Sequence, residues 1–152
     1  MPTTLYVWDV ENDSLIEELD GSGNSIVTYT QTPNQFGGTI SEDRGGSTSY
    51  YHYDGLGSTL ALSNQSGVVT DEYSYSAYGE VVASSGSTTN PFKYVGKYGY
   101  YTDSETNDIY IRARTYQPTV ARWCSRDPIG FEAGSLCLYE YCHGKPNKYI
   151  DP

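Results

Sequence analysis

Apolar and polar side chains alternate along most of the chain with a period of two residues. Such alternation is typical of β-strands that bury one face. Clusters of Gly, Asn, Asp and Ser interrupt it at short intervals and predict turns. Through the first half of the chain this pattern predicts eight strands, over residues 5–10, 15–19, 25–30, 37–41, 49–53, 58–63, 67–75 and 79–83.

The pattern changes after a polar loop at residues 84–90, because the segment that follows is rich in tyrosine. Short aromatic strands are predicted over 92–96 and 98–101, and a longer one over 108–116. That longer strand would place Tyr110, Arg112, Arg114 and Tyr116 on one side. A single turn over 119–123 is the one helical element that we expect.

These elements predict an all-β fold of winding antiparallel hairpins, followed by a short irregular C-terminal core segment. We divide the chain accordingly into hairpins over residues 1–90 and a core segment over 91–152. A unit of strand, glycine turn, strand and tyrosine-rich segment recurs near 5–30, 50–78 and 92–116, at uneven intervals. A short run of such hairpins leaves open sheet edges, which other strands must cover.

Composition supports a folded chain with a neutral surface. The content of Leu, Ile, Val and Phe is low enough to approach that of disordered chains, but 17 Tyr and two Trp supply large apolar area. The net charge of −10 makes nucleic acid an unexpected partner, because binding phosphates needs a cationic surface. Since no apolar stretch approaches about 20 residues, we expect no membrane span.

The charge is distributed unevenly. Residues 1–92 hold nearly all of the excess acidic groups, whereas residues 93–152 are close to neutral. Two interpretations remain open: two differently solvated faces, or complementarity between the opposite ends of neighbouring chains.

The residues that could hold a metal or a disulfide are few. Cys124, Cys137 and Cys142 are odd in number and form no Cys-x-x-Cys pair, so no disulfide framework is expected, although one pair could form in an exported chain. For Cys142 and His143 we favour a buried thiol beside a surface imidazole over a metal site. No cofactor is expected. Asn12 and Asn64 lie in glycosylation sequons of the kind that a Ser-rich chain contains by chance.

Several motifs resemble those of the RHS (rearrangement hotspot) family. Residues 51–59, YHYDGLGST, look like its tyrosine–aspartate repeat, and residues 75–80 look like the end of another repeat. The series that begins at Tyr110-x-Arg112-Ala113-Arg114 continues through Arg126-Asp127-Pro128 to Tyr149-Ile150-Asp151-Pro152, and it resembles the RHS-repeat-associated core domain. The resemblance is close over residues 50–152 and looser over 5–49.

The resemblance implies a β-ribbon wound into a hollow shell, of the kind that encloses a C-terminal toxin. It also implies a core domain that plugs one end of the shell and cuts the chain after an Asp-Pro-x-Gly motif. By resemblance, Asp127, Asp151 and Arg114 are the candidate catalytic residues of an aspartyl-protease-like centre. Two carboxylates in a buried site share a proton, and an arginine keeps one of them ionised. The alternative is that both Asp-Pro pairs are structural corners.

The chain departs from the family pattern at its end and at two internal places. It stops at Pro152, where the pattern continues with x-Gly and cargo. Cys137 stands where the family usually has Asn, and Gly144-Lys145 replaces an Asn-rich approach to Pro146. A protease centre would therefore have nothing to cut within this chain.

Three functions remain open. The first is a structural module that caps a larger shell or assembles with itself into an oligomer or filament. The second is the autoproteolytic end of a toxin shell without its cargo. The third is a binding module that uses exposed tyrosines. The N-terminus carries no basic or apolar leader pattern, so no secretory signal is expected, while the resemblance implies an extracellular or cell-surface location.

Overall fold

A single antiparallel sheet of eight strands forms the first half of the protein. The computed structural model describes residues 3–133 and 136–151. The sheet is a meander in which each strand pairs with the next along the chain. Its strands are β1 (Thr4–Asp9), β2 (Ser14–Asp20), β3 (Ser25–Gln31), β4 (Thr39–Arg44), β5 (Ser47–Tyr53), β6 (Thr59–Asn64), β7 (Val69–Tyr75) and β8 (Val81–Ser85). All eight predicted strands are confirmed, with ends that shift by a few residues.

The second half contains a smaller antiparallel sheet and short 3₁₀ helices. The four strands lie in the order β12-β11-β10-β9. They are β9 (Tyr101–Thr102), β10 (Ile109–Ile111), β11 (Arg114–Gln117) and β12 (Arg122–Trp123). The helices in the described part of the chain are η1 (Gly96–Tyr98), η2 (Gly130–Ala133) and η3 (Cys142–Gly144). The predicted all-β fold class is confirmed.

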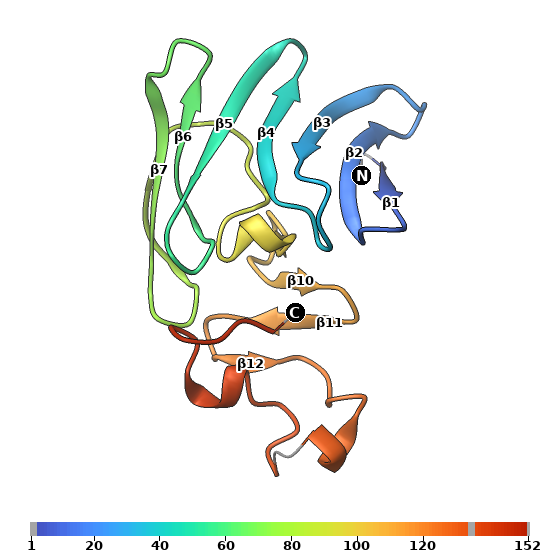
Figure 1. The fold of residues 1–152 in the computed structure, drawn as a ribbon, viewed down its shortest axis with the longest axis vertical. Coiled ribbons are helices and arrows are strands. Elements are labelled where there is room, and N and C mark those ends of the chain that lie inside the picture. Colours follow the sequence, from blue (N-terminus) through green and yellow to red (C-terminus); the bar gives the residue numbers. More distant parts are fainter. Residues whose placement is uncertain (1–2, 134–135, 152) are drawn as a thin grey trace.

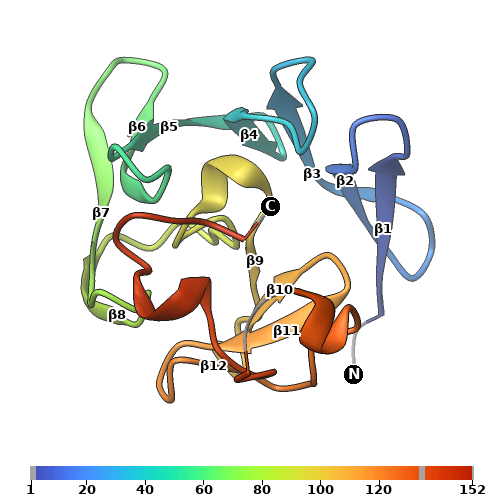
Figure 2. The same cartoon turned by 60° about the horizontal axis from the view of Figure 1, so that its bottom comes forward.

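The eight-stranded sheet bends into an open arc, and the rest of the chain folds back inside it. Figure 2 shows the arc running from β8 through β5 to β1, with the segment after β8 on its inner side. Figure 1 shows β10, β11 and β12 below the arc, and the C-terminal end beside β11. The strands therefore form a wall. The segment that contains Phe92 and Tyr101 packs against its inner face, and the smaller sheet and the C-terminal segment lie below it (Figure 1).

Buried tyrosines line the inner face of the arc. Tyr29, Tyr51 and Tyr73 lie on β3, β5 and β7, and each is less than a tenth exposed. They pack in one apolar cluster with Phe92, whose ring meets that of Tyr29 edge-on at 4.9 Å between centroids. The three tyrosines are 22 residues apart. This regular period, two strands and two turns long, is a repeat that the sequence analysis described as uneven.

One-residue bulges recur across the sheet and bend it. Each of β2, β4, β6 and β8 carries a β-bulge against the strand before it, where the register shifts by one residue. In these four strands the extra residue is an exposed apolar one: Ile16, Ile40, Leu60 or Val82. Strands β3 and β7 carry a similar bulge, at Ile26 and Thr70. Bulges increase local twist and bend the bulged strand. Repetition of the same bulge across the sheet explains why it curves into an arc.

Four turns between the strands share one design. They are Asp20–Gly23, Asp54–Gly57, Asn64–Gly67 and Ser76–Gly79. The glycine N–H donates to the carbonyl of the first residue at 2.9–3.2 Å. The first residue's side-chain oxygen accepts a main-chain N–H four positions later at 2.8–3.2 Å. Each glycine has a φ between 76° and 95°, a conformation that favours glycine.

Several predictions for the second half are wrong. Residues 92–96 form turns and the start of η1 instead of a strand, and in 98–101 only Tyr101 belongs to a strand. The predicted helical turn over 119–123 is the turn between β11 and β12, followed by β12 itself. The predicted single strand over 108–116 is a hairpin, because Ile111 pairs with Arg114 across a two-residue turn.

Arg112 explains why the alternating segment folds into a hairpin. It occupies the first position of the turn with a φ of 51°, which is uncommon for a residue other than glycine. Its guanidinium lies 3.5 Å from the centre of the Phe36 ring and 3.5 Å from Asp13 Oδ2, and donates to the Tyr98 carbonyl at 3.1 Å. Tertiary contacts of the side chain therefore hold the unfavourable backbone conformation.

Packing crosses the division at residue 90 in two places. Phe92 and Tyr101 pack in the cluster on the inner face of the sheet. A second cluster, centred on Tyr100, Tyr116 and Tyr141, receives partly buried side chains from the turns of the sheet. The division into 1–90 and 91–152 stays a prediction.

We predict that two glycines in equivalent turns respond differently to alanine. Gly67 and Gly79 both have positive φ, but a Cβ at Gly79 would lie 2.5 Å from the Tyr94 ring, whereas a Cβ at Gly67 would meet nothing within 4 Å. Gly67→Ala should cost about 1–2 kcal/mol of unfolding free energy through backbone strain alone. Gly79→Ala should cost about 2 kcal/mol more through overpacking. Urea unfolding measures both free energies. Equal losses of unfolding free energy in the two variants would show that the Gly79 turn is not packed closely against Tyr94 of the core segment.

Candidate functional site

The three residues nominated by resemblance meet at one guanidinium. Arg114 begins β11, Asp127 follows β12, and Asp151 lies near the C-terminal end. Arg114 Nη1 donates to Asp127 Oδ2 at 3.2 Å, and its Nη2 donates to Asp151 Oδ2 at 2.8 Å. The structure thus brings together all three side chains from three separate segments.

Arg114 is held in place by its surroundings. The hairpin turn at Arg112 starts β11 at this residue, and the Arg114 guanidinium lies 3.9 Å from the centre of the Trp123 ring on β12. Trp123 is buried, and the Arg114 side chain is only 14% exposed. Since water screens a mostly buried guanidinium poorly, its attraction for the two carboxylates is stronger than at the surface.

Asp127 serves a turn and the ion pair at the same time. Its Oδ1 accepts the N–H of Ile129 at 2.9 Å, and its carbonyl accepts the N–H of Gly130 at 3.0 Å. The bond from the Gly130 N–H is the one found in the four turns of the sheet, while the side chain here accepts the N–H two positions later instead of four. The other carboxylate oxygen, Oδ2, faces Arg114. The structural corner and the candidate site therefore use different atoms of one side chain.

Asp151 differs from Asp127 in its environment. Burial raises the pKa of the Asp151 carboxyl above its ordinary value, Arg114 opposes this rise, and the neighbouring Asp127 adds to it. Its main chain is bound by the Tyr100 hydroxyl, which donates to the Asp151 carbonyl at 2.7 Å and accepts its N–H at 3.0 Å. The site thus holds a carboxyl with a raised pKa next to a second carboxyl group on the same guanidinium, an arrangement of the kind used in general acid–base chemistry.

The other candidate residues are not gathered into a site. His52 Nε2 bonds Ser63 Oγ at 2.8 Å, and Asn12 donates to Asp9 at 2.7 Å. Burial raises the pKa of the Cys142 thiol to about 11. None of the three cysteines forms a disulfide. Within residues 3–133 and 136–151, no cluster of three metal-ligating side chains is present, and no helix is long and apolar enough to cross a membrane.

Two neighbours of the site, Tyr100 and Trp123, escaped the sequence analysis. Among 17 tyrosines nothing in the pattern distinguishes Tyr100. Trp123 follows Arg122 in a segment that was predicted as a helical turn. Tyr100 and Trp123 come near the ion pairs of Arg114 only because the chain folds back onto β11.

An aromatic groove lies at the β1 end of the arc. It has a volume of about 360 Å³ and lies between β1 and the β9–β10 region. Tyr6, Trp8 and Tyr110 line it and are each about half exposed, and the Tyr6 ring meets Tyr101 edge-on at 5.7 Å. At the same time, β1 pairs with only one strand, β2, in the described part of the chain.

Comparison with known proteins identifies the family. The Teneurin YD-shell family matches residues 19–136. The chain belongs to this family. The match confirms the resemblance to RHS-type repeat proteins that the motifs indicated.

The relatives and solved structures with similar chains are far longer. The tRNA3(Ser)-specific nuclease WapA of Bacillus spizizenii is 31% identical over 98% of this chain, and the double-stranded DNA deaminase toxin A of Burkholderia cenocepacia is 26% identical over 99%. This chain spans only 6% and 11% of those two proteins. The TcdB2-TccC3 crystal structure matches 98% of this chain with a TM-score of 0.65 and 16% identity, over 10% of its own length. The chain therefore contains a YD-shell domain and is similar to a small part of these much longer proteins.

We predict that Asp151 and Asp71 affect the pH dependence of stability with opposite signs. Because the pKa of Asp151 is raised, its contribution is fully present below the unfolded pKa of about 3.9 and is lost as the pH rises through the folded value. Burial also acts to raise the pKa of Asp71, but hydrogen bonds from Thr88 and Thr70 outweigh it and lower that pKa, so its contribution is lost as the pH falls.

Urea unfolding between about pH 3 and 7 tests this with Asp151→Asn and Asp71→Asn. The unfolding free energy of the unmodified protein, minus that of the variant, should fall with rising pH for Asp151→Asn and rise for Asp71→Asn. Slopes of the same sign would contradict the electrostatic description of the site.

Proposed function

We propose that this chain is a structural part of a larger YD shell. The eight strands would form a section of the shell wall, and residues 91–151 would cover its inner side. The open aromatic edge at β1 carries this proposal. Three half-exposed aromatic side chains line a groove beside a strand whose outer edge pairs with nothing in the described residues. An unpaired edge recruits further strands, and the inward side chains of such strands would fill the groove.

The aromatic side chains of β1 support the same conclusion. The 22-residue spacing of Tyr29, Tyr51 and Tyr73 does not extend to β1, where Val7 stands at that position, but Tyr6 and Trp8 of β1 line the groove. Another hairpin beyond β1 would pack against these rings. The much greater length of the relatives agrees with a wall made of many such hairpins. Where no longer shell is present, a second copy of this chain can supply the strands that pair with the open edge of β1.

We predict that the 152-residue chain self-associates through this edge. Light scattering after size exclusion should give a mass several times 16.8 kDa. Trp8→Ser should shift the population toward monomer, because Trp8 supplies the largest apolar surface of the groove. Tyr50→Ser is the matched control, since Tyr50 is 40% exposed but lies on β5, away from the edge. If the unmodified chain is a folded, monodisperse monomer, self-association is refuted. The proposal then keeps only the role of a cap on a longer shell.

Self-cleavage is a second candidate function, favoured by the convergence of Asp127 and Asp151 on Arg114. Asp127 would take a proton from a water whose oxygen attacks the carbonyl carbon of a peptide bond beyond Pro152. The protonated carboxyl of Asp151 would donate its proton to the leaving nitrogen, so that one water is consumed and one C–N bond breaks. The raised pKa of Asp151 suits it to the role of the acid.

We predict that the chain, continued past Pro152 by Leu-Gly and a reporter domain, releases the reporter. Asp127→Asn or Asp151→Asn should slow the release at least about 100-fold, as expected for loss of a general acid or base. Glu132→Gln is the control, because it removes an exposed carboxylate of η2 close by in the sequence. Gel electrophoresis and mass spectrometry of the products measure the release. An intact extended chain would exclude self-cleavage.

A further inference from the structure

One phenol holds both main-chain polar groups of Asp151. The Tyr100 hydroxyl donates to the Asp151 carbonyl oxygen at 2.7 Å and accepts the N–H of the same residue at 3.0 Å. The two bonds join positions 51 residues apart in the sequence. A hydroxyl has one proton and two lone pairs, so a single oxygen can make both bonds at once.

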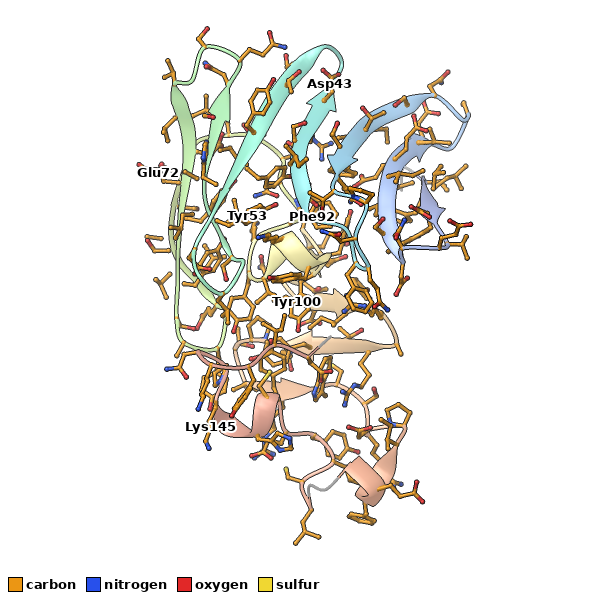
Figure 3. The ribbon with its side chains drawn as sticks, in the orientation of Figure 1. Asp43, Tyr53, Glu72, Phe92, Tyr100 and Lys145 are labelled. Atoms are coloured by element: carbon orange, nitrogen blue, oxygen red, sulfur yellow. The ribbon has the colours of Figure 1, made fainter. Side chains whose placement is uncertain are left out.

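Tyr100 is itself enclosed by other side chains. Its side chain is fully buried in the cluster that contains Tyr116 and Tyr141, and Tyr141 donates to the Tyr100 hydroxyl at 3.4 Å. Figure 3 shows Tyr100 in the middle of the molecule, between the arc and the smaller sheet. Burial raises the pKa of the Tyr100 phenol above its ordinary value, so the proton that it donates stays in place throughout the physiological range.

We propose that Tyr100 is a positioning residue, which fixes the main chain of Asp151 so that its carboxylate meets Arg114 beside Asp127. The Asp151 carboxylate lies on a side chain with two rotatable bonds, and its direction depends on where the main chain is held. Tyr100 holds that main chain at both N–H and carbonyl, and Arg114 then receives the carboxylate at 2.8 Å. The inference rests on self-cleavage for its catalytic meaning, but the placement of Asp151 can be measured without cleavage.

The placement has a chemical consequence. Arg114 opposes the rise in the pKa of Asp151, and Asp127 adds to it, so this pKa depends on the distances among the three groups. Loss of the Tyr100 hydroxyl frees the main chain and lets the carboxylate move relative to both neighbours. The titration of Asp151 should therefore change, although Tyr100 touches none of the carboxylate oxygens.

The matched pair Tyr100→Phe and Tyr116→Phe tests the proposal. Tyr116 is also fully buried, belongs to the same cluster, and donates its hydroxyl to a main-chain carbonyl, that of Tyr78, at 2.8 Å. Each substitution removes one buried hydroxyl and leaves one main-chain carbonyl without its donor, and Tyr100→Phe also leaves the Asp151 N–H and the Tyr141 hydroxyl without their acceptor. A purely structural role of Tyr100 would therefore make the two variants differ in stability but leave the Asp151 titration alike.

The first readout is the titration of the Asp151 carboxyl in the 152-residue chain, followed by carboxyl ¹³C NMR below the unfolding temperature. Tyr100→Phe should move the midpoint by at least about half a pH unit, and Tyr116→Phe should leave it unchanged. Tyr141→Phe serves as a second variant, because it removes the bond into Tyr100 but keeps both bonds to Asp151, and it should also leave the midpoint unchanged. An unmoved midpoint in folded Tyr100→Phe overturns the proposal.

The second readout is reporter release from the extended chain. Tyr100→Phe should slow release at least about tenfold and shift its pH profile, whereas Tyr116→Phe should release at the unmodified rate. If the unmodified extended chain stays intact, self-cleavage fails and the titration alone decides the role of Tyr100. If the chain is cleaved and Tyr100→Phe matches it in rate, pH profile and titration midpoint, self-cleavage stands and the positioning role is excluded.

Discussion

A curved sheet with an apolar inner face must have that face covered, and this constraint governs the rest of the fold. The bulges that recur across the strands bend the sheet, and the bend gathers Tyr29, Tyr51 and Tyr73 toward a common interior. Residues after 90 return into this space, where Phe92 packs against the tyrosines. Because the inner face supplies much of the apolar area that a chain poor in Leu and Ile can bury, wall and filling depend on one another for stability.

The eight-stranded sheet could be predicted from the sequence, whereas most of the structure after residue 90 could not. The difference is whether local residues or distant contacts fix each element. Strands of the sheet repeat a local pattern of alternation, and four of their connections are Asp-, Asn- or Ser-x-x-Gly turns that are closed by their own residues. In the core segment, local pattern and tertiary contact disagree. The alternation over 108–116 favours one strand, but the stacking of Arg112 on Phe36 and its pairing with Asp13 hold a turn in the middle of it. No local signal reports contacts with residues so distant in the sequence.

The candidate site shows the same division. Motif resemblance nominated Arg114, Asp127 and Asp151, and the structure brings them together. The sequence could not indicate which carboxyl has the raised pKa, because that depends on burial and on the neighbours around Asp151. It could not indicate Tyr100 either, since a tyrosine that binds a distant main chain has no pattern of its own.

The structural and catalytic interpretations of the two Asp-Pro pairs need not exclude each other. Asp127 closes a turn with Oδ1 and faces Arg114 with Oδ2, so one fixed side chain meets both requirements. The turn holds the carboxylate rigidly, which is what a preorganised acid–base pair requires. At Asp151 the main chain is held instead by the Tyr100 hydroxyl, which bonds both its carbonyl and its N–H. Asp127 is fixed by its own turn and Asp151 by a buried phenol, so the two carboxyl groups have unequal environments. In a self-cleavage reaction this difference would make Asp151 the acid and Asp127 the base.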